Sequence, residues 1–131
     1  MLNMHKLFLI IASFLAALAV ALGAFGAHGL KKIVDAETVA IYQTGVQYQM
    51  YHALALLALG ILAERFSSSL VHYAGFLFIG GVVLFSGSLY MVASLKAMNN
   101  AVPTAIRIMT PIGGALFVLG WVLLFIALLK K

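Results

Sequence analysis

The sequence predicts an all-α integral membrane protein, a four-helix transmembrane bundle that forms a single domain over residues 1–131. Hydrophobic residues make up 65% of the chain and charged residues 8%, whereas soluble domains have roughly 45–50% apolar and about 25% charged residues. So few charged residues cannot cover a soluble domain of this size. The chain of 131 residues is also short for two domains of ordinary length.

Four stretches without a charged residue divide the chain. A helix needs about 20 residues, at about 1.5 Å each, to cross a hydrocarbon core of about 30 Å. Each stretch is long enough for this and far too long for one strand of a transmembrane barrel. The stretches are Leu7 to Ala27, Thr38 to Ala63, Tyr73 to Leu95 and Ile108 to Leu129. We therefore expect spans at about residues 7–27, 44–63, 73–95 and 108–129, with 35–47 as a polar or interfacial start of the second helix.

The first expected span begins after a basic residue and ends in small residues, as a secretory signal does. Lys6 precedes the apolar run, and the segment 23–27 closes it. Because the run exceeds the roughly 7–15 residues of a signal core and three more spans follow, we expect a retained helix, with cleavage as the alternative. Steps of three and four residues align Ala16, Ala19 and Gly23 as a small-residue face, a pattern that simple Ala-rich filler explains equally well.

The second expected span carries polar side chains into the membrane. Asp35 is placed to cap the helix, and Glu37 lies in its first turn, where a carboxylate suits the helix dipole. Because the apolar part that begins at Ala53 is too short to cross alone, the polar residues before it must enter too. Amides and an imidazole facing lipid are costly, so we expect them to face the interior, a water-filled cavity or the headgroup layer. At helical spacing they form two adjacent rows, Gln43–Gln47–Tyr51 and Thr44–Tyr48–His52.

The third and fourth spans carry polar and small residues at matching ends. Ser86 and Tyr90 share one face of the third span. Thr110 and Pro111 open the fourth, where proline in the first turn costs little because its missing amide hydrogen has no helical partner there. Trp121 lies in the middle of the fourth span and is interpreted as a packing residue. Close helix contact is predicted at Gly23, Gly26, Gly87, Gly113, Gly114 and Gly120.

The alternation of four spans brings the polar residues to one half of the bundle. Both termini and the second connection must share one side of the membrane, and the first and third connections must share the other. On that second side, the end of the first span and the start of the second meet the end of the third and the start of the fourth. We predict a polar pocket there, formed by His28, Gln47, Tyr48, Tyr51, His52, Ser86, Ser88, Tyr90 and Thr110.

The formal net charge of +5 does not indicate a nucleic-acid partner. The basic residues stand singly or in pairs between apolar runs, as residues that flank membrane spans do, and they form no basic face. The positive-inside count is tied, and because Lys6 precedes the first helix, which usually dominates, we expect the termini on the cytoplasmic side. The chain has no cysteine, which excludes disulfides and thiolate chemistry. The side of the termini carries Lys6, Arg65, Lys130 and Lys131, and the other side carries Lys31, Lys32, Lys96 and Arg107.

Four strings of residues also resemble a known family. They are GAFGAHG at 23–29, YQMYHALA at 48–55, LFSGSLY at 84–90 and TPIGG at 110–114, followed by Gly120 and Trp121. In order and spacing they resemble the bacterial membrane family called domain of unknown function 423, also catalogued as uncharacterised protein family 0382 and similar to eukaryotic transmembrane protein 256. The resemblance covers nearly the whole chain. It implies a multi-pass protein of the bacterial cytoplasmic membrane, and it supplies no established activity, substrate or catalytic residue.

Three function classes compete to explain the polar residues. We favour a small structural or interaction protein, in which polar side chains fix the bundle geometry and glycine faces bind a second copy or another membrane protein. The alternative is a protein that binds or transports a lipid headgroup, a small amphiphile or a proton through a vestibule centred on His52. An intramembrane enzyme comes last, because Ser86 and Ser88 have no base and acid partner at a fixed spacing.

His52 carries the most specific of these hypotheses. An ionisable group inside a membrane is a functional-site hypothesis by default, and the competing interpretation is a neutral imidazole hydrogen-bonded to Tyr or Ser across the bundle. His28 is placed to bond the last carbonyls of the first helix. With only Asp35 and Glu37 as nearby acids, we expect no metal site, and we expect no cofactor or catalytic residue. Membrane lipids are the expected partners, and nucleic acid is not.

Overall fold

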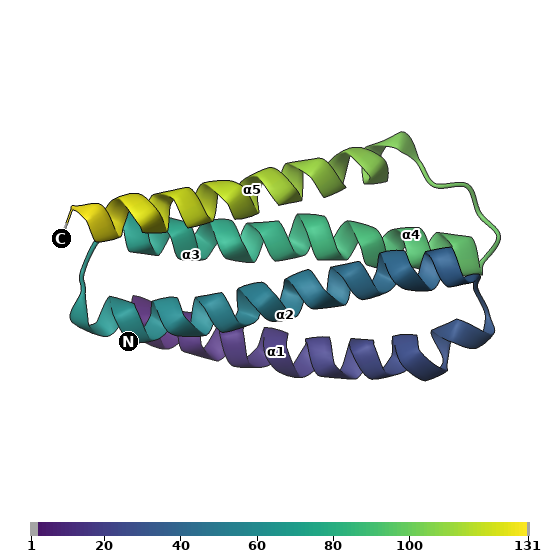
Figure 1. Cartoon of the computed structure of the whole chain (residues 1–131), viewed down its shortest axis with the longest axis horizontal. Coiled ribbons are helices and arrows are strands. Elements are labelled where there is room, and N and C mark those ends of the chain that lie inside the picture. Colours follow the sequence, from purple (N-terminus) through teal and green to yellow (C-terminus); the bar gives the residue numbers. More distant parts are fainter. Residues whose placement is uncertain (1–2, 131) are drawn as a thin grey trace.

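Four long helices account for most of the chain. The computed structural model describes residues 3–130, and these contain no strand. Four helical segments, Met4–Lys32, Ala36–Arg65, Ser69–Ala97 and Thr104–Leu129, are long and apolar enough to cross a membrane. The prediction of an all-α four-helix membrane protein is confirmed (Figure 1). The elements are α1 (Met4–His28), η1 (Leu30–Lys32), α2 (Ala36–Arg65), α3 (Ser69–Gly81), η2 (Val82–Ser86), α4 (Gly87–Ala97) and α5 (Thr104–Leu129).

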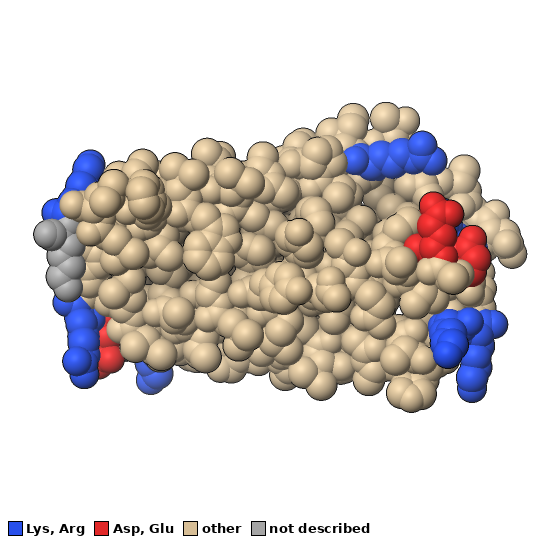
Figure 2. Space-filling model, in the orientation of Figure 1, with Lys and Arg blue, Asp and Glu red and all other residues tan. Residues whose placement is uncertain are grey.

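The helices run up and down in chain order and separate two ends of the bundle (Figure 1). Both chain ends and the connection 66–68 lie at one end, which we call the terminus end. The segments 29–35 and 98–103 lie at the other, which we call the loop end. Figure 2 shows Lys and Arg gathered toward these two ends, with other residues covering the surface between them. This is the distribution expected of a chain that spans a membrane.

The third span, Ser69–Ala97, is one continuous helix with an irregular turn in its middle. At η2 the backbone forms a π-helix, in which the N–H of Gly87 bonds to the carbonyl of Val82 five residues earlier. Before this turn, α3 packs mainly against α5, and after it, α4 packs mainly against α2. The π turn therefore lies where the third span changes its main neighbour. Such turns are rare and occur frequently at functional sites.

Apolar side chains fill the terminus half of the bundle. Phe8 and Ala12 of α1 pack with Leu56 of α2 in one buried cluster. A larger cluster joins α2, the third span and α5, and it contains Leu59, Val71, Ala74, Phe78, Val82, Phe117 and Ala127. A third, smaller cluster of Leu30, Tyr42 and Ala93 lies toward the loop end. The buried polar residues Thr38, Gln49, His52, Ser86 and Ser88 lie between the middle of the bundle and the loop end.

The start of α2 follows its local sequence signal. The Asp35 carboxylate accepts the backbone N–H of Thr38 at 2.8 Å and so caps the helix, as expected for an aspartate at this position. At the far end of α4, Asn99 reverses the chain with a φ of 57°, a conformation that asparagine adopts more readily than most residues. These two turns bring the start of α2 and the end of α4 to the same level at the loop end.

The start of α5 differs from the prediction. The helix begins at Thr104, directly after Pro103, so the expectation that Pro111 lies in its first turn is wrong. Pro111 lies about two turns further along, where it cannot donate a hydrogen bond to the carbonyl of Arg107. The polar residues after Pro103 extend the helix beyond the apolar stretch on which the prediction was based.

Candidate functional site

Inward-facing polar residues of α2 lie in a single row that also contains a glycine. Tyr42, Gly45, Gln49 and His52 are all buried, and steps of three and four residues keep them on one side of the helix. We call them the inner row. Gln49 is 1% exposed and His52 is 5% exposed, so amide and imidazole groups lie inside the bundle.

Much of the predicted polar stripe faces away from this interior. Gln47 and Tyr51 are exposed, Tyr51 at 56%, so placing these two residues in an interior pocket is wrong. Each residue turns an α-helix by about 100°, and a row that points Gln49 inward sends Gln47 outward. Tyr48 lies at the boundary, because its side chain is exposed while its ring centroid is 4.8 Å from that of Phe85.

Two residues of α2 bond to the backbone of α1 near the loop end. The Tyr42 hydroxyl donates to the carbonyl of Leu22 at 2.6 Å, and the Gln43 amide donates to the carbonyl of Gly23 at 3.3 Å. A Cβ on Gly26 would come within 2.7 Å of the Tyr42 ring, so only glycine admits the side chain this close to the α1 backbone. Because each carbonyl oxygen has two lone pairs, it accepts such a bond beside its helical one.

Gln49 links three helices near the middle of the bundle. Its amide nitrogen donates to the carbonyl of Leu15 in α1 at 2.8 Å, and its amide oxygen accepts the Tyr90 hydroxyl of α4 at 2.6 Å. One turn away, the Ser86 hydroxyl donates to the carbonyl of Gly45 at 2.6 Å. These bonds join α1, α2 and the third span through the Gln49 side chain and the Gly45 carbonyl of the inner row.

Ser88 and Thr110 join the third span to α5. The Ser88 hydroxyl donates to the carbonyl of Phe85 at 2.8 Å, and its oxygen lies 2.6 Å from the Thr110 hydroxyl. Because the Ser88 proton goes to the carbonyl, Thr110 supplies the proton for the bond between the two hydroxyls. The pair thus binds a carbonyl of the π turn.

His52 is enclosed by aromatic rings. It stacks on Phe117 with ring centroids 3.6 Å apart, and Phe78 meets it edge-on at 5.2 Å. Its Nδ1 lies 2.8 Å from the carbonyl of Tyr48, and the Trp121 indole N–H donates to its Nε2 at 3.1 Å. A carbonyl can only accept and an indole N–H can only donate, so Nδ1 carries the proton and the ring is neutral. Its partners are therefore a backbone carbonyl and a tryptophan, where a Tyr or Ser hydroxyl was expected.

His28 lies apart from these polar contacts. It is exposed at the end of α1, where its Nδ1 is 3.0 Å from the carbonyl of Ala24 in the same helix, so its assignment to the pocket is wrong. Within residues 3–130, no buried side-chain nitrogen or oxygen of a non-exposed residue lacks a hydrogen-bond partner. The polar residues of the interior thus form a closed set of bonds that the chain satisfies by itself.

The predicted packing glycines divide into two groups. A Cβ on Gly113 would overlap the backbone nitrogen of Phe85, whereas one on Gly114 would make an ordinary contact at 3.9 Å. The assignment of Gly87 is wrong, because no atom lies within 4 Å of the place where its Cβ would stand. Cβ atoms at three further predicted glycines would press on side chains of a neighbouring helix, and these are Gly23, Gly26 and Gly120.

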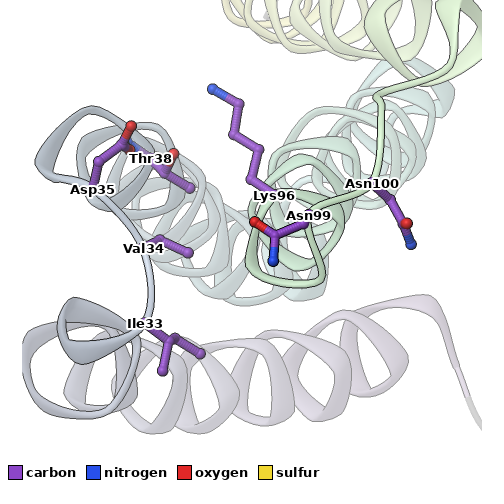
Figure 3. A pocket seen from close by; sticks show the side chains of 7 residues that line it. All are labelled: Ile33, Val34, Asp35, Thr38, Lys96, Asn99 and Asn100. Carbon is purple, nitrogen blue, oxygen red and sulfur yellow. The ribbon is translucent and has the colours of Figure 1, made fainter.

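A second polar site opens at the loop end. It is a recess of about 400 Å³ lined by Ile33, Val34, Asp35, Thr38, Lys96, Asn99 and Asn100. Figure 3 shows Asp35 and Thr38 at the start of α2, facing the end of α4 with Lys96 and Asn99. Hydrogen bonds from Thr38 hold the pKa of the Asp35 carboxyl below its usual value, and the positive charge of Lys96 adds to this. The recess therefore carries a negative and a positive charge at neutral pH.

Comparison with known proteins settles the family. Residues 22–114 match the family model described as "Protein of unknown function (DUF423)". The chain belongs to the DUF423 family. It is 41% identical over 127 residues to the UPF0382 membrane protein SAB0533 of Staphylococcus aureus (strain bovine RF122 / ET3-1), which covers 95% of this chain and 97% of that one. It is 43% identical over 126 residues to the UPF0382 membrane protein YwdK of Bacillus subtilis (strain 168), with coverage of 95% and 98%. No solved structure matches.

The inner row of this DUF423 protein could have been found from its apolar half. Leu56 and Leu59 are buried in α2. Four residues before Leu56 is His52, and three residues before His52 is Gln49, so the buried leucines and the inner row share one face. The mutual spacing of the polar residues groups them into rows but does not show which row faces inward. The aromatic enclosure of His52 had no local signal, because Phe78 and Phe117 come from helices distant in sequence.

In this DUF423 protein, a double-mutant cycle tests the bond between His52 and Trp121. His52→Phe keeps an aromatic ring on Phe117 but leaves the indole N–H without an acceptor, which costs about 1–3 kcal/mol of unfolding free energy. Trp121→Phe removes the donor, so the double variant contains no indole N–H that lacks an acceptor. We therefore expect the double variant to lose at least about 0.5 kcal/mol less than the sum of the two single losses. Unfolding in detergent micelles measures all three, and strictly additive losses would contradict the bond.

Proposed function

We propose that this protein is a structural and interaction protein of the bacterial cytoplasmic membrane, whose polar interior fixes the bundle and whose α2 binds a second copy of the chain. The observation that carries the proposal is the exposure of Gln47 and Tyr51 on the outer face of a spanning helix. The closed interior supports its first half, because the buried polar side chains are satisfied within the chain. Lys6 in the first turn of α1, ahead of the apolar part of the first span, supports termini on the cytoplasmic side.

Gln47 and Tyr51 lie deep in the membrane. Tyr51 is roughly 20 Å along the helix axis from each of the charged residues Glu37 and Glu64, at about 1.5 Å per residue. This places it near the middle of a hydrocarbon core of about 30 Å, with Gln47 only one turn away. Neither side chain makes a hydrogen bond within residues 3–130. Because lipid tails offer no hydrogen bonds, an exposed amide and hydroxyl at this depth favour a protein partner.

The outer face of α2 has the pattern of a helix-pairing seam. Its residues alternate steps of four and three, the spacing by which two helices pack in a left-handed pair. A glutamine amide is both donor and acceptor, so two copies of Gln47 facing each other across a twofold axis satisfy one another. A second copy is therefore the partner that this surface fits. We call this surface the outer row, and it consists of Ala40, Thr44, Gln47, Tyr51, Leu54, Ala58 and Ile61.

Disulfide trapping tests the proposed pair, because the chain has no cysteine of its own. We expect Leu54→Cys in the outer row to form a disulfide-linked dimer when native membranes are oxidised. Phe125→Cys, at a similarly exposed position of α5, is the matched control and should stay monomeric. Adding Gln47→Leu to the Leu54→Cys chain should lower the dimer yield about threefold or more, the effect of losing an interhelical hydrogen bond in a membrane.

Two results would overturn the proposal. Equal cross-linking at both cysteine positions would indicate random collision, and no cross-linking at Leu54→Cys would exclude a pair formed through α2. Native mass spectrometry of the parent protein provides an independent check. A monomer that retains a small molecule, which a folded His52→Phe variant then loses, would favour the binding or transport function instead.

A further inference from the structure

The recess at the loop end is lined by two residues of opposite charge. Asp35 stands at the start of α2 and Lys96 at the end of α4, and both line the same hollow (Figure 3). Asn99 and Asn100 add side-chain amides, which both donate and accept hydrogen bonds. Its volume of about 400 Å³ lies in the range of about 300–1,000 Å³ typical of small-molecule sites.

The recess lies at the depth of the lipid headgroups. It is formed by the two segments that connect spans at the loop end, directly beyond the apolar helices. The polar layer of a bilayer begins where the hydrocarbon core of about 30 Å ends. Ile33 lines the recess and is exposed, which gives an apolar edge beside the charged groups. A headgroup could enter while its acyl chains stay against the helices.

We propose that this recess binds a phosphoethanolamine group, with Lys96 holding the phosphate and Asp35 holding the ammonium. A purely anionic group would meet the Asp35 carboxylate, and a purely cationic group would meet the Lys96 ammonium. A zwitterion satisfies both charges, and the Asn99 amide, which lies beside Lys96 (Figure 3), can bond its phosphate oxygens. The group can belong to phosphatidylethanolamine or to free phosphoethanolamine. The proposal does not depend on the α2 pair.

Lipid competition monitored by native mass spectrometry tests the proposal. The full-length protein is equilibrated with phosphatidylethanolamine and phosphatidylglycerol of matched acyl chains, and the bound ratio of the two is measured. We expect the parent to retain phosphatidylethanolamine preferentially. Asp35→Asn should lower the ratio about tenfold, the effect of losing one hydrogen bond to a charged group. Lys96→Gln should lower the retained amount of both lipids, because both carry the phosphate that Lys96 holds. Asp35→Asn preserves the helix cap because asparagine caps as well as aspartate.

Matched controls separate the recess from the general charge of this end. Lys31→Gln and Glu37→Gln remove the same charges from nearby residues that do not line the recess, and they should leave the ratio unchanged. The proposal is overturned if the parent shows no preference, if the recess variants match the parent, or if the controls lose as much. Displacement of the lipid by free phosphoethanolamine supports a soluble ligand, and its failure to displace supports a lipid ligand in the same recess.

Discussion

Gly113→Ala is expected to destabilise the bundle by about 3 kcal/mol, the upper end of the usual cost of overpacking a core. A Cβ at this position would overlap the backbone nitrogen of Phe85, and it would stand 2.7 Å from the Phe85 Cα. Backbone in the middle of a helix cannot rotate aside as a side chain can, so α5 would have to move away from the π turn. That movement would also separate Thr110 from Ser88. Reversible unfolding in detergent micelles measures the loss.

Gly114→Ala and Gly87→Ala are the matched controls, because they make the same chemical change in the same two spans. The first adds a methyl group at ordinary contact distance, and the second adds one in open space. Alanine is the better helix former by about 1 kcal/mol, so both controls should keep or raise the unfolding free energy. If Gly113→Ala behaves like them, the close approach of α5 to the third span is contradicted.

Gln49→Leu is expected to cost about 2 kcal/mol of unfolding free energy, the second largest effect. Leucine has a similar volume but removes the donor to Leu15 and the acceptor of Tyr90. An interhelical hydrogen bond in a membrane contributes about 0.6 kcal/mol on average, and a buried hydroxyl left without a partner costs about 1–3 kcal/mol. Adding Tyr90→Phe should therefore recover part of the loss.

Ser94→Ala serves as the control for this prediction. The Ser94 hydroxyl also donates to a carbonyl, but that carbonyl belongs to Tyr90 in the same helix, and Ser94 is exposed. Removing it breaks no contact between helices, so its effect should stay within about 0.5 kcal/mol. Similar losses for Gln49→Leu and Ser94→Ala would show that the Gln49 bonds do not hold the helices together.

The fold was accessible from sequence because membrane spans follow from composition and length. Charges fall only at the ends of the apolar runs, and lipid leaves the helix as the simplest way to pair the backbone. The helices nevertheless extend past the apolar stretches. At the start of α5, for example, Thr104 and Arg107 continue the helix toward the headgroup layer, and hydropathy gives no signal for such polar turns.

The candidate site was less accessible, because hydropathy does not determine which way a polar residue faces. The assumption that polar groups avoid lipid predicts inward positions for His52, Gln47 and Tyr51 alike, but Gln47 and Tyr51 face outward. That assumption fails if the residues meet another protein. Trp121 was interpreted as packing alone, and its bond to His52 depends on the contact between α2 and α5. The charged recess was missed because Asp35 and Lys96 come together only when two distant turns meet.

Because of the π turn at Val82–Ser86, the insertion of the third span into the bilayer and its correct packing depend on different features of the sequence. The extra residue in this turn rotates the second half of the span by about 100° relative to an unbroken α-helix. A chain one residue shorter there would remain helical, apolar and long enough to insert. Ser86 and Tyr90 would then point away from Gly45 and Gln49. Insertion into the bilayer is thus encoded by the hydrophobicity of these 29 residues, whereas correct assembly is encoded by their register.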